Sequence, residues 1–133
     1  MIKGEYFFHS HSGKKYTVKG IISCKTKHVV YLLKCPCGLC YIGKTIRELK
    51  TRFSEHKSAI RNKDEKSPVA RHFNAVGHDV CTLRFQGIEL VPPPRRGGDR
   101  DNILLKKEAR WIHELETESP RGLNEELLLG CFL

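Results

Sequence analysis

Two ionisable side chains lie within the apolar stripes of predicted helices. His56 follows Phe53 at helical spacing, and Glu108 precedes Trp111 in the same way. An ionisable group in an apolar environment costs several kcal/mol unless it is paired or binds a metal. A neighbouring Lys or Arg could satisfy Glu108, so spacing alone leaves its role open. An imidazole can transfer protons near neutral pH, and a carboxylate offers the hard oxygen ligand that Mg²⁺ prefers.

A second group of residues has the composition of a metal site. Cys35 and Cys37 form a Cys-x-Cys pair followed by Gly38, and His72 and His78 lie further along the chain. Two thiolates and two imidazoles supply a tetrahedral zinc site, and a glycine after the second cysteine suits a tight turn. We expect such a zinc ion to be structural, tying a hairpin turn to a helix.

Other uses of the cysteines stay open. The chain has six, and Cys40 or Cys24 could replace either thiolate ligand. Any of them could instead be a small buried apolar group. Disulfides would suit a secreted chain, but residues 1–22 alternate charges with aromatic residues where a signal peptide needs an apolar run. Reduced thiols are therefore expected.

The elements that must position these residues begin with a hairpin. Val29–Leu33 is a short apolar run rich in β-formers, and Tyr41–Gly43 follows after a connection with Pro and Gly. The pair predicts antiparallel strands, with Tyr31 and Tyr41 on neighbouring strands. Residues 1–22 hold no sustained period and are expected to form a loosely packed basic arm with one short strand at Tyr16–Val18.

Helices and a further strand follow from capping residues and periodicity. Thr45 and Glu48 have the spacing of a capping box and predict a helix start. Ser67-Pro68 predicts a second start, and Gly77 predicts its end. The remaining predicted elements are a strand at Leu83–Val91, an exposed basic loop at Pro92–Arg100, and a helix from Asp101 to about Thr117 that Ser119-Pro120 ends. The predicted inner faces are Leu49, Phe53, His56 and Ile60 on one helix, and Leu104, Glu108, Trp111 and Leu115 on the other.

Taken together, the ordered residues resemble a nuclease family. Val29-Val-Tyr31 and Tyr41-Ile-Gly43, followed in order by Arg52, His56, Glu108 and Asn124, resemble the GIY-YIG nuclease superfamily. The first triplet departs from the family name, because Val29-Val30 replace Gly-Ile. Glu108–Thr117 and the Pro-Arg-Gly-Leu-Asn segment ending at Asn124 also resemble the endonuclease domains of Penelope-like retroelements. The likeness covers about residues 24–126.

The resemblance implies a fold and an activity. The fold would be α+β, a small three-stranded antiparallel sheet flanked by helices with an inserted zinc-binding element, occupying residues 23–133 after an arm at 1–22. The activity would be metal-dependent DNA cleavage, with Glu108 holding a catalytic Mg²⁺ or Mn²⁺. The retroelement likeness further implies target-site nicking and a fused or associated reverse transcriptase. Those nucleases also carry a Cys-Cys-His-His set, which supports zinc.

The resemblance also implies roles for individual residues. Tyr31 would help deprotonate the attacking water, which requires a nearby cation such as the metal or Arg52 to lower its pKa. Tyr41 would position the water or hydrogen-bond the phosphate, Arg52 would grip the phosphate, and His56 would orient or transfer a proton. Asn124 would brace the site. Gly43 would let the backbone approach the substrate, with Lys44 as a further substrate-binding residue. Independently of the resemblance, the exposed basic loop makes Arg95 and Arg96 candidates for contact with DNA.

Composition bounds these readings. The chain has 133 residues, 24 Lys and Arg against 15 Asp and Glu, and a net charge of +9, which suits one domain and a polyanionic partner. No segment is apolar enough to cross a membrane, and an intracellular, nuclear location is expected. Two alternatives stay open: a zinc-stabilised DNA-binding module without catalysis, and a disulfide-stapled extracellular domain.

Overall fold

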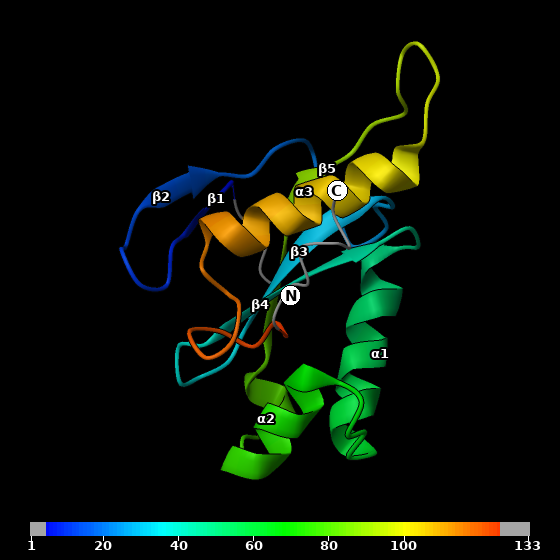
Figure 1. The fold of residues 1–133 in the computed structure, drawn as a ribbon. Helices are drawn as coiled ribbons and strands as arrows, with labels where there is room; N and C mark the ends of the chain where they lie inside the picture. Colours follow the sequence, from blue (N-terminus) through cyan, green and yellow to red (C-terminus); the bar gives the residue numbers. More distant parts are fainter. Residues whose placement is uncertain (1–4, 126–133) are drawn as a thin grey trace.

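A three-stranded antiparallel sheet forms the centre of the computed structural model, which describes residues 5–125 (Figure 1). The strands lie in the order β4-β3-β5, so that β3 is central and β4 is an edge. The strands and helices are β1 (Tyr6–Phe8), β2 (Lys15–Thr17), β3 (Val29–Lys34), β4 (Cys40–Thr45), α1 (Leu49–Arg61), α2 (Pro68–Val76), β5 (Arg84–Leu90) and α3 (Arg100–Glu114), with a short 3-10 turn at Val80–Thr82. The predicted fold class is confirmed.

Helices cover both faces of the sheet. Side chains of a strand alternate between faces, and β3 is buried on both. Val29, Tyr31 and Leu33 pack with residues of α1 and α2 in one core cluster. Val30 and Leu32 pack with residues of α3 in the other. An uninterrupted apolar run such as β3 is typical of a strand covered on both sides, and Figure 1 shows α3 crossing the sheet on the side opposite α1.

The predicted N-cap of α1, Thr45, is wrong by three residues. Thr45 pairs with Val29 and belongs to β4, and its hydroxyl oxygen accepts a hydrogen bond from Arg47 N at 3.1 Å. The N-cap is Glu48, which makes no side-chain capping bond. Sheet pairing thus outweighs the local capping pattern. The inner stripe was predicted correctly in Leu49, His56 and Ile60, which are all buried.

The second helix begins and ends as predicted. Ser67 caps α2 by accepting from Ala70 N at 3.2 Å, with Pro68 in the first turn. Gly77 ends the helix in the left-handed conformation at φ 78°, which glycine adopts without steric cost. The two histidines of the predicted metal site therefore lie on α2 and just after it.

The third helix is shorter than predicted. Asp99 caps its start by accepting from Asn102 N at 3.1 Å, and it ends at Glu114 rather than near Thr117. Glu116 adopts a φ of 53°, which stops the helix before the Ser-Pro pair. The predicted face is otherwise present, because Leu104, Trp111 and Leu115 are buried.

The N-terminal segment packs on the domain instead of lying loosely against it. It forms a two-stranded antiparallel sheet, β1 with β2, beside the C-terminal half of α3 (Figure 1). Phe7 is 3% exposed and belongs to the core cluster under α3. Its ring lies 5.5 Å from those of Tyr16 and Trp111. The expectation of loose packing is therefore wrong, although the short strand near Tyr16 exists.

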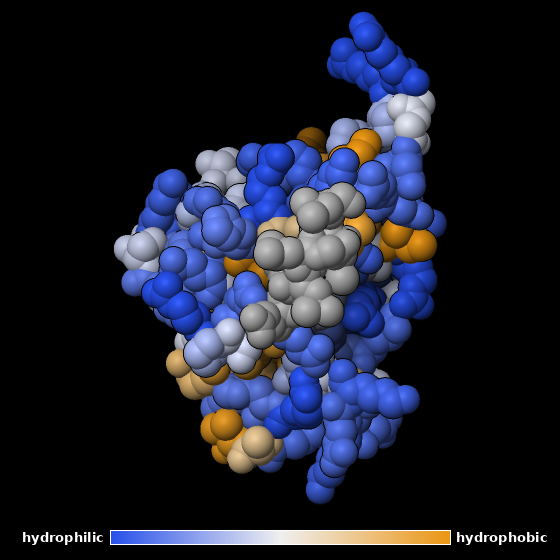
Figure 2. All heavy atoms as spheres, in the orientation of Figure 1, coloured by the Kyte–Doolittle hydropathy of each residue, from blue (hydrophilic) through white to orange (hydrophobic). Residues whose placement is uncertain are grey.

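The surface is largely polar. Figure 2 shows a mostly hydrophilic face with scattered hydrophobic residues, and the loop between β5 and α3 projecting from one corner as a hydrophilic extension. Of the helices described within residues 5–125, not one has the length and apolarity that a membrane crossing demands.

Candidate active site and metal centre

Tyr31 is the hub of the predicted catalytic residues. Its side chain is fully buried at the centre of β3, and its phenolic oxygen lies 2.7 Å from His56 Nε2. Arg52 Nε donates to the same oxygen at 3.1 Å. Because the guanidinium can only donate, the phenol hydrogen is free to point to His56, which then carries its own proton on Nδ1. Arg52 and His56, which lie 21 and 25 positions after Tyr31 in the sequence, thus meet at its phenolic oxygen.

Gly43 makes room for this phenol. It pairs with Tyr31 across the β3–β4 ladder, and a Cβ at position 43 would lie 2.3 Å from the Tyr31 hydroxyl and 2.4 Å from Cζ. No side chain can occupy that space without moving the ring. Glycine is thus required at position 43 to leave space for the Tyr31 ring, a role that the sequence did not predict. Its backbone contact with substrate stays a prediction.

Tyr41 and His56 face a surface cleft. Their ring centroids are 5.7 Å apart, and both residues line a hollow of about 350 Å³ together with Arg52. The remaining lining residues are Glu55, Ala59, Asp64, Lys66, Ser67 and Pro68. The hollow is mixed in charge, since Arg52 lies 3.8 Å from Glu55 in an ion pair. A phosphate entering here would compete with Glu55 for the guanidinium.

Glu108 reaches the group from the opposite face of the sheet. It is half-buried on α3, and its negative charge raises the pKa of both Tyr31 and Tyr41, although it does not line the cleft that Tyr41, Arg52 and His56 share. Burial raises the pKa of Glu108 itself, and Lys44 and Arg52 oppose that shift. Within residues 5–125 this carboxylate makes no hydrogen bond or ion pair. It is thus available to a ligand.

Burial is the main influence on the protonation states of Tyr31 and His56. It raises the pKa of Tyr31, the Tyr41 phenol adds to the rise, and Arg52 only partly opposes it. Arg52 thus acts on the Tyr31 pKa in the direction that the predicted role requires, but burial outweighs it, and the further effect of a metal stays a prediction. Burial, then Arg52, lower the pKa of His56 to about 3. At neutral pH Tyr31 is a phenol and His56 a neutral imidazole.

Asn124 fastens the edge strand. Ile42 N donates to its Oδ1 and its Nδ2 donates to Ile42 O, both at 2.8 Å. Thr117 Oγ1 also donates to Oδ1, at 2.7 Å. The side-chain amide thus imitates a paired strand along β4, between the residues Tyr41 and Gly43. This geometry agrees with the predicted bracing role.

The predicted DNA-contacting arginines stand apart from this cluster. Arg95 and Arg96 are exposed in the loop that projects between β5 and α3 (Figure 1). Within residues 5–125 no hydrogen bond or ion pair joins them to the catalytic cluster, and neither lines the cleft. Their contact with substrate stays a prediction, and it would be made outside the cleft.

The predicted zinc ligands converge. The ligand atoms of Cys35, Cys37, His72 and His78 all lie within 4.8 Å of one another. His72 Nε2 is 3.1 Å from Cys35 Sγ and 3.3 Å from Cys37 Sγ. His78 Nε2 is buried without a hydrogen-bond partner, which is the kind of orphaned atom that a metal would satisfy.

The alternative thiols lie outside this group. The cluster does not include Cys40 or Cys24, and Cys40 is buried in the core under α3. All five cysteines within residues 5–125 are free. The geometry therefore selects the two thiols first predicted, in the β3–β4 turn, and joins them to the helix that carries His72.

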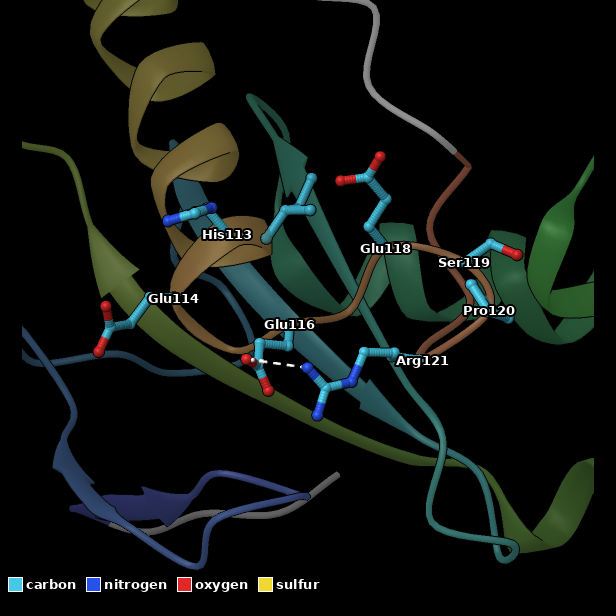
Figure 3. Close-up of a pocket in the computed structure, with 8 residues that line it drawn as sticks. His113, Glu114, Glu116, Glu118, Ser119, Pro120 and Arg121 are labelled. Atoms are coloured by element: carbon cyan, nitrogen blue, oxygen red, sulfur yellow. Dashed lines mark ion pairs between the residues drawn. The ribbon is translucent and has the colours of Figure 1, made fainter.

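A second hollow of about 500 Å³ lies between the end of α3 and the following loop (Figure 3). Its polar lining is mainly acidic, and Figure 3 shows Glu116 paired with Arg121, at 3.0 Å. Glu114 and Glu118 also line it, and Glu114 accepts a hydrogen bond from Tyr16. None of the predicted catalytic residues lines it, and its charge opposes phosphate binding.

Sequence reasoning missed three contributors. Thr117 completes the hydrogen bonds of Asn124, and Glu55 and Lys66 line the cleft. Lys66 directly precedes Ser67 and Pro68, which begin α2 and also line the cleft. The helix start was therefore the sequence signal that could have placed Lys66 at the cleft. Glu55 is one residue before His56, but adjacent helical positions do not share a face.

Comparisons with known proteins agree with this geometry. The sequence profile described as the GIY-YIG catalytic domain matches residues 27–124. The "Structure of the Catalytic Domain of Homing Endonuclease I-TevI" is similar in fold, with a TM-score of 0.59 and 19% identity, covering 76% of this chain and 100% of that chain. Curated protein sequences gave no match. With the profile spanning most of the chain, from before the first triplet to Asn124, the chain belongs to the GIY-YIG catalytic domain family of nucleases.

Proposed function

We propose that this domain is a magnesium-dependent DNA endonuclease that hydrolyses phosphodiester bonds. The observation that carries the proposal is the meeting of Tyr31, Arg52 and His56 at one phenolic oxygen, beside a half-buried carboxylate, Glu108, that has no partner in residues 5–125. A polyanionic substrate suits the net charge of +9.

The hydrogen bonds define a path for the proton of the attacking water. A phenol with a raised pKa is a poor base by itself, but Tyr31 donates to a neutral imidazole. As water gives its proton to the Tyr31 oxygen, the phenol proton passes to His56 Nε2 over 2.7 Å. Arg52 stabilises negative charge on the phenolic oxygen during this transfer through the 3.1 Å bond.

Phosphate binding would use the cations around the cleft. Arg52 can turn its terminal nitrogens from Glu55 to a phosphate oxygen, since a charge-assisted bond to phosphate is stronger than a long ion pair of 3.8 Å. Lys66 lines the same cleft and supplies a second positive charge. Tyr41, on the wall of the cleft, would donate its hydroxyl to the phosphate.

Glu108 fits the role of magnesium ligand. Its oxygens are hard donors, it lacks a hydrogen bond or ion pair in the described chain, and it lies near both phenols. Mg²⁺ commonly uses one or two carboxylates together with substrate phosphate oxygens. When bound, the ion would neutralise charge on the phosphate and on the leaving oxygen. Mn²⁺ offers the same coordination chemistry.

We also propose that Cys35, Cys37, His72 and His78 hold a structural zinc ion. The support is their convergence within 4.8 Å and the orphaned Nε2 of His78. A closed set of four protein ligands leaves no position for a substrate. The ion would fix the β3–β4 turn, and with it the ends of the strands that carry Tyr31 and Tyr41, to α2.

The resemblance to Penelope-like endonuclease domains supports a narrower proposal. Residues Glu108–Thr117 and Asn124 match that pattern in the sequence, so we propose target-site nicking in the nucleus, with an associated or fused reverse transcriptase as partner. Affinity capture with the natural full-length protein, followed by a reverse-transcriptase assay, tests this; absence of that activity from the captured material would count against it.

A plasmid assay tests the central proposal. Purified protein is incubated with supercoiled plasmid, with Mg²⁺ or with a magnesium chelator, and open-circle product is measured. We expect product only with Mg²⁺, and a loss of at least about 100-fold in Glu108→Gln, the scale expected when a group that stabilises transition-state charge is removed.

The matched control is Asp101→Asn, which makes the same charge change on the same helix at an exposed residue. Its nicking should stay within about twofold of the wild type. Binding of duplex DNA should survive in both variants. Equal nicking by Glu108→Gln and wild type would overturn the proposal, and retained binding without any nicking would favour a non-catalytic DNA-binding module.

A further inference from the structure

The β1–β2 sheet presents an aromatic face that the proposed chemistry does not use. It lies upstream of residues 27–124, the part that matches the family profile. On its inner face Phe7 and Tyr16 pack against Trp111. On its outer face Tyr6 and Phe8 are 49% and 47% exposed, although large aromatic side chains are normally covered. Two exposed rings on one three-residue strand call for an explanation.

The outer face combines these rings with positive charge. The register sets Tyr6 opposite Thr17 and Phe8 opposite Lys15, so these four residues share one side of the sheet. Lys15 Nζ lies 4.0 Å from the centre of the Tyr6 ring. Lys15 carries the positive charge of this face, because Lys14 pairs with Glu114 at 3.9 Å and Lys19 lies over the Trp111 ring, both on the α3 side. The face is therefore both aromatic and cationic.

We propose that this outer face is a binding surface for single-stranded DNA. Aromatic rings beside lysines form the usual platform for unpaired nucleic acid, because bases stack on the rings and phosphates meet the cations. The two rings meet edge to face, with centroids 5.9 Å apart and planes at 80°, so bases stacked on both could not lie parallel to one another as they do in a duplex. The two rings thus fit bases that have separated from one another, which only a single strand offers.

Charge argues against the other occupants. A protein partner or a second copy of this chain, which itself carries +9, would have to cover Lys15, and interface cores are depleted of lysine. A DNA strand uses both features. In the free protein Lys15 covers the Tyr6 ring; on binding, a base takes that position and the ammonium group moves to a phosphate.

The sheet is held firmly to the catalytic helix. Tyr16 donates its hydroxyl hydrogen to Glu114 Oε1 at 2.7 Å, and Gln86 Nε2 donates to Tyr6 O at 3.2 Å. Trp111, which packs under Phe7, is on α3 one turn after Glu108. A strand on the outer face would therefore be held at a fixed position relative to the proposed cleavage site. Its identity as DNA rests on the proposed nuclease substrate.

Fluorescence anisotropy with a labelled oligothymidine, a duplex of equal length and an oligouridine tests the proposal at one stated salt concentration. The double variant Tyr6→Ala/Phe8→Ala should bind oligothymidine at least about tenfold more weakly, since each lost base stack is worth that order of affinity. Duplex binding should change less than about twofold. Ile21→Ala, which removes a 95% exposed apolar side chain outside this face, should bind like the wild type.

Three results would overturn the proposal: unchanged oligothymidine binding in the double variant, an equal loss for duplex, or tighter binding of oligouridine than of oligothymidine. A loss of self-association by the variant, with DNA binding intact, would assign the face to a second copy of the chain instead. Phe8→Trp gives a second measurement that keeps the face aromatic. Its fluorescence should be quenched by oligothymidine, and absence of quenching would refute stacking. Plasmid nicking is a separate readout, so failure here leaves the nuclease proposal standing.

Discussion

The neutral state of His56 should make the stability of the domain depend on pH. Its side chain is 5% exposed, and burial, then Arg52, lower its pKa to about 3, against about 6.5 for an unperturbed histidine. Below pH 6.5 the unfolded chain takes up a proton that the folded chain refuses. This contribution to stability is therefore complete above about pH 6.5 and is lost as pH falls toward 3.

The size of the effect follows from the gap between the two pKa values. At pH 5 the solution lies about 1.5 units below the ordinary value, and each unit is worth about 1.4 kcal/mol. Protonation of His56 in the unfolded state should thus cost about 2 kcal/mol of stability between pH 7 and pH 5. That is a large share of the 5–15 kcal/mol, roughly, that hold a typical domain together.

Urea unfolding, followed by fluorescence of the chain's single tryptophan, the buried Trp111, measures this cost. His56→Gln is the matched variant, because an amide can still bond the Tyr31 hydroxyl and does not titrate. The wild type should lose about 2 kcal/mol more than the variant on going from pH 7 to pH 5. Other histidines and any bound metal affect both proteins alike. Equal losses of unfolding free energy in the two proteins would show that His56 does not cause this pH dependence.

Three further predictions concern packing and metal binding. Gly43→Ala should destabilise the fold by about 1–3 kcal/mol, because the added methyl group clashes with Tyr31. Thermal unfolding should show a smaller loss of stability when the same change is made in a Tyr31→Ala protein. Equal losses in the two backgrounds would contradict the clash. Asn124→Ala should cost at least about 2 kcal/mol in urea unfolding, because buried groups of the edge strand lose their partners, and wild-type stability would refute the bracing role. Cys37→Ser should lose the zinc that metal analysis finds after dialysis, whereas the exposed Cys81→Ser should keep it; retention by both would remove Cys37 from the site.

The main elements could be predicted because their signals are local. The apolar run Val29–Leu33 is too short for a helix and too apolar for an exposed strand, and it is the doubly covered centre of the sheet. Ser67 with Pro68 carries a complete helix start, and Gly77 a complete stop. In each case the residue that determines the structure lies inside the element or next to it.

The errors came from interactions between distant residues. Thr45 has a capping residue's chemistry, but its pairing with Val29 keeps it in a strand. Phe7 belongs to the core only because Trp111, far along the chain, packs against it. Strands of three residues carry too little periodicity to predict a sheet, so the β1–β2 sheet could not be inferred from the first 22 residues alone.

The sequence could predict which residue types meet at Tyr31, but it could not predict their pKa values. Residue order carries the types, whereas a pKa depends on the number of apolar atoms packed around each group. Tyr31 lies beside Phe85, with ring centroids 4.7 Å apart, and such neighbours favour the neutral phenol more than the adjacent guanidinium favours the phenolate. The sequence showed that a guanidinium could lower the Tyr31 pKa, but it could not show how deeply the phenol is buried.

Burial keeps Tyr31 protonated at neutral pH, and in the proposed mechanism this gives a role to the His56 imidazole that is hydrogen-bonded to it. To take a proton from water, a lone buried phenol would first have to lose its own proton and hold a full negative charge, at the large cost that an apolar environment sets on an isolated ion. With a neutral imidazole 2.7 Å away, the phenol releases its own proton as it receives one. The low pKa of His56 keeps the imidazole unprotonated at neutral pH, but it also makes the imidazole a weak proton acceptor. In the proposed mechanism the imidazolium would therefore form only transiently and would give its proton up readily.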